Sequence, residues 1–107
     1  MDKDNAPATA GTAFLTILEG VIRQRINEQP PDSYVASLAA AGDKRLAQKL
    51  GEEAVELALA VTAGDTAEQL EEAADLLFHL LVLLNAKGMR LADVTAILQQ
   101  RHASSKR

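Results

Sequence analysis

Apolar residues recur at helical spacing along most of this chain. Near its start, intervals of three and four residues separate Leu15, Leu18, Ile22 and Ile26. This period predicts an amphipathic helix that begins at Thr12, a residue type that caps helices, and ends before Pro30-Pro31. Residues 1–11 lack such a period, and we expect them to form a flexible arm. No run alternates with a period of two for long enough to be a strand, so the sequence predicts an all-α fold.

Capping and chain-breaking residues divide the next part of the chain into two helices. Asp32 or Ser33 can cap a short helix that runs through Leu38 and ends at Gly42. Asp43 can cap a longer helix that continues to residue 63. On a helical wheel its apolar residues share one side and its acidic residues the other, with Glu53 at the border. The predicted inner side holds Leu46, Leu50, Ala54, Leu57, Ala58 and Val61.

The fourth predicted helix follows Gly64 and has two possible capping boxes, Thr66 with Gln69 or Asp65 with Glu68. It continues to residue 87, and a fifth helix covers residues 90–102. Apolar residues surround the fourth helix from residue 76 to residue 84, which predicts burial on all sides. A chain of this size can hardly enclose such a helix by itself. We therefore expect a homodimer or a higher homo-oligomer.

Composition narrows the class of protein. The chain has 107 residues, enough for a single domain, which we place at residues 12–104. A net charge of −4 argues against a nucleic-acid-binding protein with a diffuse basic surface. The longest apolar run is less than half of the roughly 20 residues that span a bilayer, so no membrane association is expected. The charged N-terminus has no signal-peptide core after it, which predicts a cytoplasmic location.

Two acidic clusters stand at helical spacing. They are Glu52-Glu53-x-x-Glu56 and Glu72-x-x-Asp75. A helix advances by about 100° per residue, so each cluster presents two carboxylates on one face. If the two helices pack antiparallel with these faces together, Glu53, Glu56, Glu72 and Asp75 converge. Such hard oxygen ligands suit Mg²⁺ or Mn²⁺.

The acids also have a simpler interpretation, because acidic stretches on helices are commonly solvated faces. Against this, like charges three and four residues apart repel, and Lys49 is the near basic neighbour of the first cluster on that face. Lys44 and Lys49 can contact phosphates or can simply be surface residues. Di-iron carboxylate bundles are disfavoured, because they use Glu-x-x-His where this chain has Glu-x-x-Asp. Spacing alone leaves the metal site and the solvated face open.

Two longer segments carry a family resemblance. Residues 49–56 (KLGEEAVE) and 72–84 (EAADLLFHLLVLL) resemble the all-α nucleotide pyrophosphohydrolases of the MazG type. With Ser33-Tyr34 upstream and His79 downstream, the pattern is most similar to the phosphoribosyl-ATP pyrophosphatase family and covers residues 14–101. The resemblance implies a five-helix MazG-like bundle that hydrolyses phosphoribosyl-ATP to phosphoribosyl-AMP and pyrophosphate in histidine biosynthesis. Such proteins commonly have Tyr before the histidine, and this chain has Phe78.

The resemblance also implies roles for single residues. Glu53, Glu56, Glu72 and Asp75 are expected to bind Mg²⁺, and Glu52 to orient the attacking water or to help hold a second ion. The expected substrate contacts come from Lys44 and Lys49 for the phosphates and from Tyr34 and His79 for the nucleotide. Tyr34 and His79 can equally be packed core side chains.

Two other functions fit the same sequence. A housekeeping nucleoside triphosphate pyrophosphohydrolase would use the same carboxylates on a different base or sugar. A non-enzymatic helical dimerisation module would carry them on its surface. Binding of Mg²⁺ separates the enzymes from the module, and a substrate panel separates the two enzymes.

Overall fold

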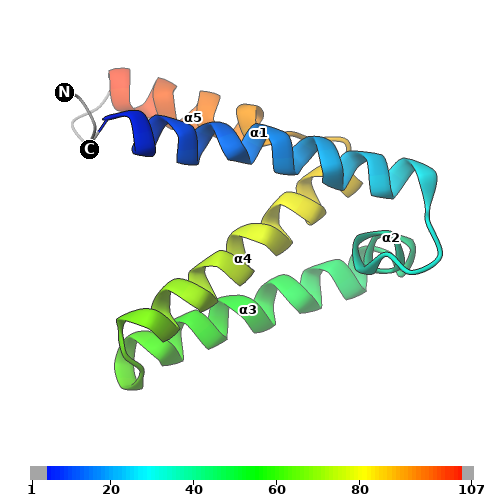
Figure 1. Ribbon diagram of the computed structural model, residues 1–107, viewed down its shortest axis with the longest axis horizontal. Coiled ribbons are helices and arrows are strands. Elements are labelled where there is room, and N and C mark those ends of the chain that lie inside the picture. Colours follow the sequence, from blue (N-terminus) through cyan, green and yellow to red (C-terminus); the bar gives the residue numbers. More distant parts are fainter. Residues whose placement is uncertain (1–4, 105–107) are drawn as a thin grey trace.

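Five helices make up the protein, which is seen here as a computed structural model that describes residues 5–104, with side chains from residue 11 (Figure 1). They are α1 (Asn5–Glu28), α2 (Tyr34–Ala40), α3 (Asp43–Ala63), α4 (Thr66–Ala86) and α5 (Leu91–Ser104). Residues 5–104 contain no strand, and the predicted all-α fold is confirmed. Within the same range, no helix combines the length and the hydropathy that crossing a membrane requires.

The first helix is longer than predicted. α1 begins at Asn5 rather than at Thr12, so residues 5–11, which belong to the predicted flexible arm, are helical. Ala6, Ala8 and Ala10 are strong helix formers, and Pro7 lies in the first turn, where its missing N–H costs nothing. A helix can therefore extend beyond its apolar stripe. Residues 1–4 of the predicted arm lie outside the described part of the chain.

The caps of two helices agree with the sequence. Ser33 caps α2 by accepting a hydrogen bond from the Ala36 N–H at 3.0 Å. The capping box of α4 is Asp65 with Glu68, whose backbone N–H donates to Asp65 at 2.9 Å. The alternative partner Gln69 instead donates to the carbonyl of Gly64 at 3.3 Å.

The cap predicted for α3 is wrong. The N-cap is Gly42, at a φ of +97° that favours glycine, and Asp43 is the first residue of the helix. The Asp43 carboxylate accepts a hydrogen bond from Lys87 Nζ at 2.8 Å, which ties the start of α3 to the end of α4.

α3 and α4 form an antiparallel hairpin that turns at Gly64 (Figure 1). The Gly64 N–H donates to the Ala60 carbonyl at 2.7 Å, which closes the end of α3. A Cβ atom at Gly64 would lie 3.0 Å from the Ala60 carbonyl oxygen and 3.2 Å from Glu68 Cβ. A side chain at Gly64 would therefore require these neighbours to move by a few tenths of an ångström.

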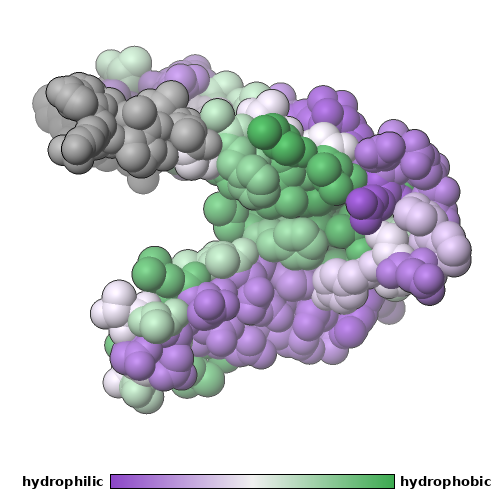
Figure 2. All heavy atoms as spheres, viewed as in Figure 1, coloured by the Kyte–Doolittle hydropathy of each residue, from purple (hydrophilic) through white to green (hydrophobic). Residues whose placement is uncertain are grey.

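The hairpin and α1 diverge from a corner where α2 lies (Figure 1). The core occupies this corner and is formed by Ile22, Val35, Leu38, Leu46, Leu81 and Val82. The Cα radius of gyration is 15.8 Å, whereas a compact chain of this length has about 13 Å. Figure 2 shows the hollow that results between the two arms, with hydrophobic residues on its inner wall. The single chain is an open clamp.

Helix α3 turns only part of its apolar side inward, because Leu46 is buried and Leu50 and Leu57 are half-buried. Its buried residues are Leu46, Glu53 and Ala60, at intervals of seven. Ala54, Ala58 and Val61, predicted to be inside, are exposed. Among the acids of α3, Glu53 is therefore buried whereas Glu52 and Glu56 are exposed, and part of the apolar side meets solvent in the single chain.

Within the apolar girdle of α4, Leu81, Val82 and Leu84 are buried by the chain's own helices, and the other apolar residues from 76 to 83 are half-buried. Larger apolar exposure occurs elsewhere. α5 has no buried residue in Leu91–Ser104. The exposed large side chains include Phe14, Ile17, Val55, Leu59, Val61, Leu70, Ile97 and Leu98.

A buried carboxylate joins three helices. Glu19 on α1 is 8% exposed, and its Oε2 accepts hydrogen bonds from Asn85 Nδ2 at 2.9 Å and from the Leu91 N–H at 2.7 Å. Asn85 Nδ2 also donates to the Leu81 carbonyl, and Arg23 donates to Asn85 Oδ1 at 3.4 Å. Glu19 thus holds the start of α5 against α1 and α4, where apolar contacts are few.

We expect Glu19→Ala to lower the free energy of unfolding by about 2–3 kcal/mol, because the buried Asn85 amide and the partly buried Leu91 N–H lose their shared acceptor. Urea unfolding followed by circular dichroism measures the change. Glu28→Ala, an exposed change on the same helix, is the control and should alter stability by less than about 0.5 kcal/mol. Equal small effects for both variants would mean that Glu19 does not hold the helices together.

Candidate metal centre

The α3–α4 hairpin positions the acidic residues. Glu53 and Glu56 are three positions apart near the middle of α3. Glu56 lies eight positions before the turn at Gly64, and Glu72 lies on α4, eight positions after it. Equal distances from the turn place Glu56 and Glu72 at the same level of the two antiparallel helices. The hairpin therefore brings together the acids of both clusters.

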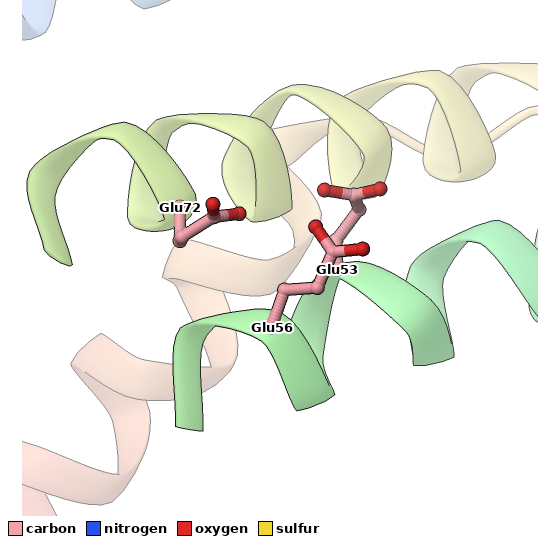
Figure 3. A group of neighbouring side chains, drawn as sticks. All are labelled: Glu53, Glu56 and Glu72. Carbon is pink, nitrogen blue, oxygen red and sulfur yellow. The ribbon is translucent and has the colours of Figure 1, made fainter. Parts of the chain in front are cut away.

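Three carboxylates converge in the space between the helices. Glu53, Glu56 and Glu72 each offer one oxygen, and these oxygens lie within 4.8 Å of one another (Figure 3). Glu53 is only 5% exposed, Glu72 is half-buried and Glu56 is open to solvent. A set of oxygen ligands open on one side suits Mg²⁺ or Mn²⁺, which keep water or substrate oxygens in their remaining positions.

Glu72 lacks compensation for its charge. Its Oε1 is buried without a hydrogen-bond partner. Desolvation raises the pKa of the carboxyl, and Glu56 raises it further by its charge and by a hydrogen bond, with smaller effects from Asp75 and Glu53. Native sites rarely leave a buried oxygen unpaired. A bound cation would satisfy this oxygen and relieve the repulsion, so the residues present fit a divalent metal.

Two of the sequence-predicted acids lie outside this group. Asp75 does not share the convergent oxygens, although its charge acts on Glu72. Glu52 is exposed and accepts a hydrogen bond from Gln48 Nε2 at 2.9 Å. This bond, opposed by desolvation and helped by Lys49, lowers the pKa of Glu52, so the carboxyl stays ionised. Both residues border the three carboxylates rather than complete them.

The two predicted lysines are placed differently. Lys49 Nζ lies 3.5 Å from Glu52 and 3.4 Å from Glu53, and thus bridges the outer and the buried acid. Burial acts to lower the pKa of Lys49, but the hydrogen bond to Glu53 and the neighbouring charges outweigh it and the pKa is raised. Lys44 is exposed in the first turn of α3. Lys49 is therefore the lysine at the acidic group.

Tyr34 and His79 contact each other. The Tyr34 hydroxyl lies 2.8 Å from His79 Nε2, and His79 Nδ1 lies 2.8 Å from the Asp75 carbonyl oxygen. The Tyr34 ring stacks near Phe78, with centroids 6.4 Å apart, whereas His79 is buried edge-on to both rings. Sequence reasoning named Tyr34 and His79 separately and missed the bond. The sequence gives no local pattern for this bond, because the two residues are 45 positions apart in the chain.

A hollow of about 300 Å³ adjoins the acids on the side of the hairpin turn. It is lined by three acids, Glu56, Glu68 and Glu72, and by Leu59, Ala60, Ala63 and Gly64. Space for a small polar molecule therefore exists beside the carboxylates.

Comparison with known proteins agrees with the geometry. The family model of phosphoribosyl-ATP pyrophosphohydrolase matches residues 15–102. A phosphoribosyl-ATP pyrophosphatase of Pyrobaculum neutrophilum is 55% identical over 84 residues, which cover 78% of this chain and 89% of that protein.

Longer relatives match as well. The histidine biosynthesis bifunctional protein HisIE of Photobacterium profundum is 50% identical over 94% of this chain, and that of Vibrio cholerae is 54% identical over 83%. This chain spans about half of these bifunctional proteins, 49% and 42% of their lengths. With a family model that covers most of its length and an acidic group between α3 and α4, the chain belongs to the phosphoribosyl-ATP pyrophosphohydrolase family.

Proposed function

We propose that this chain hydrolyses phosphoribosyl-ATP to phosphoribosyl-AMP and pyrophosphate in histidine biosynthesis, and that the reaction depends on Mg²⁺, with Mn²⁺ as a possible substitute. The observation that carries the proposal is the group of three carboxylates with an unpaired buried oxygen, in a chain of this family. Water attacks the α-phosphorus, the bond to the bridging oxygen breaks, and pyrophosphate leaves with the electron pair.

The carboxylates of Glu53, Glu56 and Glu72 would hold the metal, with Asp75 at the edge of the same group. Bound Mg²⁺ supplies charge neutralisation for the phosphate oxygens and acidity for a coordinated water. Glu52 keeps a negative charge beside this group and is proposed to orient the attacking water. Lys49 lies next to Glu53 and is the proposed phosphate contact nearest the metal. Lys44, nearer the start of the same helix, is the second proposed phosphate contact.

We also propose that the protein works as a homodimer or a higher homo-oligomer. The support is the open clamp, the exposed apolar face of α3, and α5, which has no buried residue in Leu91–Ser104. A second copy would cover these faces, and self-association is the usual way in which a chain of this size buries them.

The first prediction concerns the reaction. The purified chain should release pyrophosphate from phosphoribosyl-ATP in the presence of Mg²⁺, and chelation should abolish the release. Neutralising Glu56 or Glu52 to glutamine should each lower kcat at least roughly 100-fold, the scale of one lost electrostatic group. Only Glu56→Gln should also weaken Mg²⁺ binding measured by calorimetry.

Glu71→Gln, an exposed change on α4, is the matched control and should keep normal turnover. Release of orthophosphate, or faster cleavage of common deoxynucleotides, would instead assign the chain to the housekeeping pyrophosphohydrolases.

The second prediction concerns pH. The raised pKa of Glu72 means that the metal-free folded state holds a proton that the unfolded state releases near the ordinary value of 4.5. The stability that this proton provides is complete below 4.5 and is lost as pH rises through the raised pKa. Thermal melts of the metal-free protein should show this loss.

Glu72→Gln should remove this part of the pH dependence and keep or raise the metal-free Tm at neutral pH. Addition of Mg²⁺ should stabilise the wild type and stabilise this variant much less. If Glu72→Gln instead lowers the Tm of the metal-free protein by several degrees, Glu72 has a structural role.

The third prediction concerns assembly. Ile97 on α5 is 50% exposed in the single chain. Ile97→Asp should shift the oligomer towards monomer at micromolar concentration, because an unpaired charge buried at an interface costs several kcal/mol, on the order of that in protein interiors. Sedimentation velocity measures the shift. Gln99→Asp adds the same charge on the same helix and is the control. A monomeric wild type would refute the oligomer.

A further inference from the structure

The contact between Tyr34 and His79 fixes which group donates the hydrogen. A backbone carbonyl can only accept, so His79 Nδ1, 2.8 Å from the Asp75 carbonyl oxygen, must carry the hydrogen. In a neutral imidazole the other nitrogen then has a free lone pair. His79 Nε2 therefore accepts, and the Tyr34 hydroxyl, 2.8 Å away, donates its only hydrogen to it.

Because the hydroxyl hydrogen of Tyr34 is bonded to His79, the Tyr34 oxygen can only accept a hydrogen bond from a ligand. About half of the Tyr34 surface is open, at 48% exposure, whereas His79 is buried. Tyr34 is near enough to Lys49 to act on the pKa of this lysine, whose ammonium bridges Glu52 and Glu53. The Tyr34 oxygen is therefore an oriented acceptor beside the acidic group.

The neighbouring residues give this acceptor no substitute. Phe78, whose ring stacks near that of Tyr34, has no hydroxyl, and Tyr34 is the only tyrosine in the chain. The pair also connects α2 to the helix that carries Glu72, because His79 is on α4, one turn after Asp75. The position of Tyr34 is consequently fixed relative to the helix that carries Glu72.

We infer that the Tyr34 oxygen, with its proton committed to His79, accepts a hydrogen bond from a hydroxyl of the ribose that bears the triphosphate and so discriminates against the nucleotide that lacks this hydroxyl. The inference rests on the proposed function. With the phosphates at the carboxylates, the donors nearest along the nucleotide are the hydroxyls of the ribose that bears the triphosphate. A site that hydrogen-bonds a substrate hydroxyl discriminates against the analogue that lacks it.

The test compares substrates that differ at one hydroxyl. The values of kcat/KM are measured for phosphoribosyl-ATP and for analogues in which the 2′- or 3′-hydroxyl of that ribose is replaced by hydrogen or by fluorine. We expect one of the two positions to lose about 3- to 10-fold on replacement by hydrogen, the value of one neutral hydrogen bond. Fluorine cannot donate a hydrogen bond, so the fluorine analogue should lose as much kcat/KM as the hydrogen analogue. Full activity with fluorine would overturn the inference.

The variant that isolates the hydroxyl is Tyr34→Phe. It should lose activity with phosphoribosyl-ATP by the same factor and no longer discriminate between the hydroxyl and deoxy substrates. Ser37→Ala, which removes another hydroxyl from α2, is the matched control and should keep the discrimination. If Tyr34 has only a structural role, Tyr34→Phe should lower kcat/KM for all substrates by the same factor. The ratio of kcat/KM between the hydroxyl and deoxy substrates would then stay unchanged, and this result would refute the inference.

Two measurements keep the outcomes separable. If the wild type cleaves no phosphoribosyl-ATP, the proposed function fails; if it cleaves this substrate but treats hydroxyl and deoxy analogues equally, the inference alone fails. Nitrogen-15 NMR of His79 at neutral pH does not depend on activity or on a variant. It should show hydrogen on Nδ1 and none on Nε2, and the reverse tautomer would overturn the assigned polarity.

Discussion

Repulsion among carboxylates packed between two helices is the constraint that the rest of the structure has to accommodate. Helix pairs ordinarily bury aliphatic side chains where they meet, yet α3 turns Glu53 towards α4 and meets Glu72 there. Lys49 offsets part of the charge at Glu53, and nothing in the described residues does so for the buried oxygen of Glu72. The hairpin must therefore be held by contacts outside the acidic group.

Those contacts lie at the two ends of the hairpin. At one end the capping box of α4 and the closed turn at Gly64 fix the connection between the helices. At the other end Lys87 pairs with Asp43, and the core around Leu46, Leu81 and Val82 fills the corner under α2. Stability is concentrated away from the acids, so the acidic group is free to be shaped by its proposed ligand.

The sequence predicted the helices well, because capping residues and apolar periods act locally. Ser33 and the pair Asp65 and Glu68 are cases in which the local signal determined the structure. The start of α1 was missed, since alanine extends a helix without any apolar stripe. The exposure of Ala54, Ala58 and Val61 on α3 was missed for another reason: a helical wheel assumes that apolar residues face the chain's own core. That assumption fails where acids occupy the inside and, as we propose, a second copy covers the outside.

The site was predicted in part for similar reasons. Spacing of three positions placed two carboxylates on one face of each helix, and the antiparallel packing of α3 and α4 brings Glu53, Glu56 and Glu72 together. Asp75 lies outside this group, which the spacing did not predict. The bond between Tyr34 and His79 depends on how α2 docks on α4, which no periodicity records.

The turn at Gly64 has a consequence for how this protein can change during evolution. Glu56 and Glu72 stand at equal distances from it, and each residue of a helix adds 1.5 Å and about 100°. One residue inserted into either helix between them would turn one carboxylate relative to the other by about 100° and shift it by about 1.5 Å. Surface loops usually tolerate changes in length, but here the number of residues in an exposed turn is as constrained as the identity of the acids that it aligns. Lineages of such a chain should therefore vary in the residues around this turn, and not in its length.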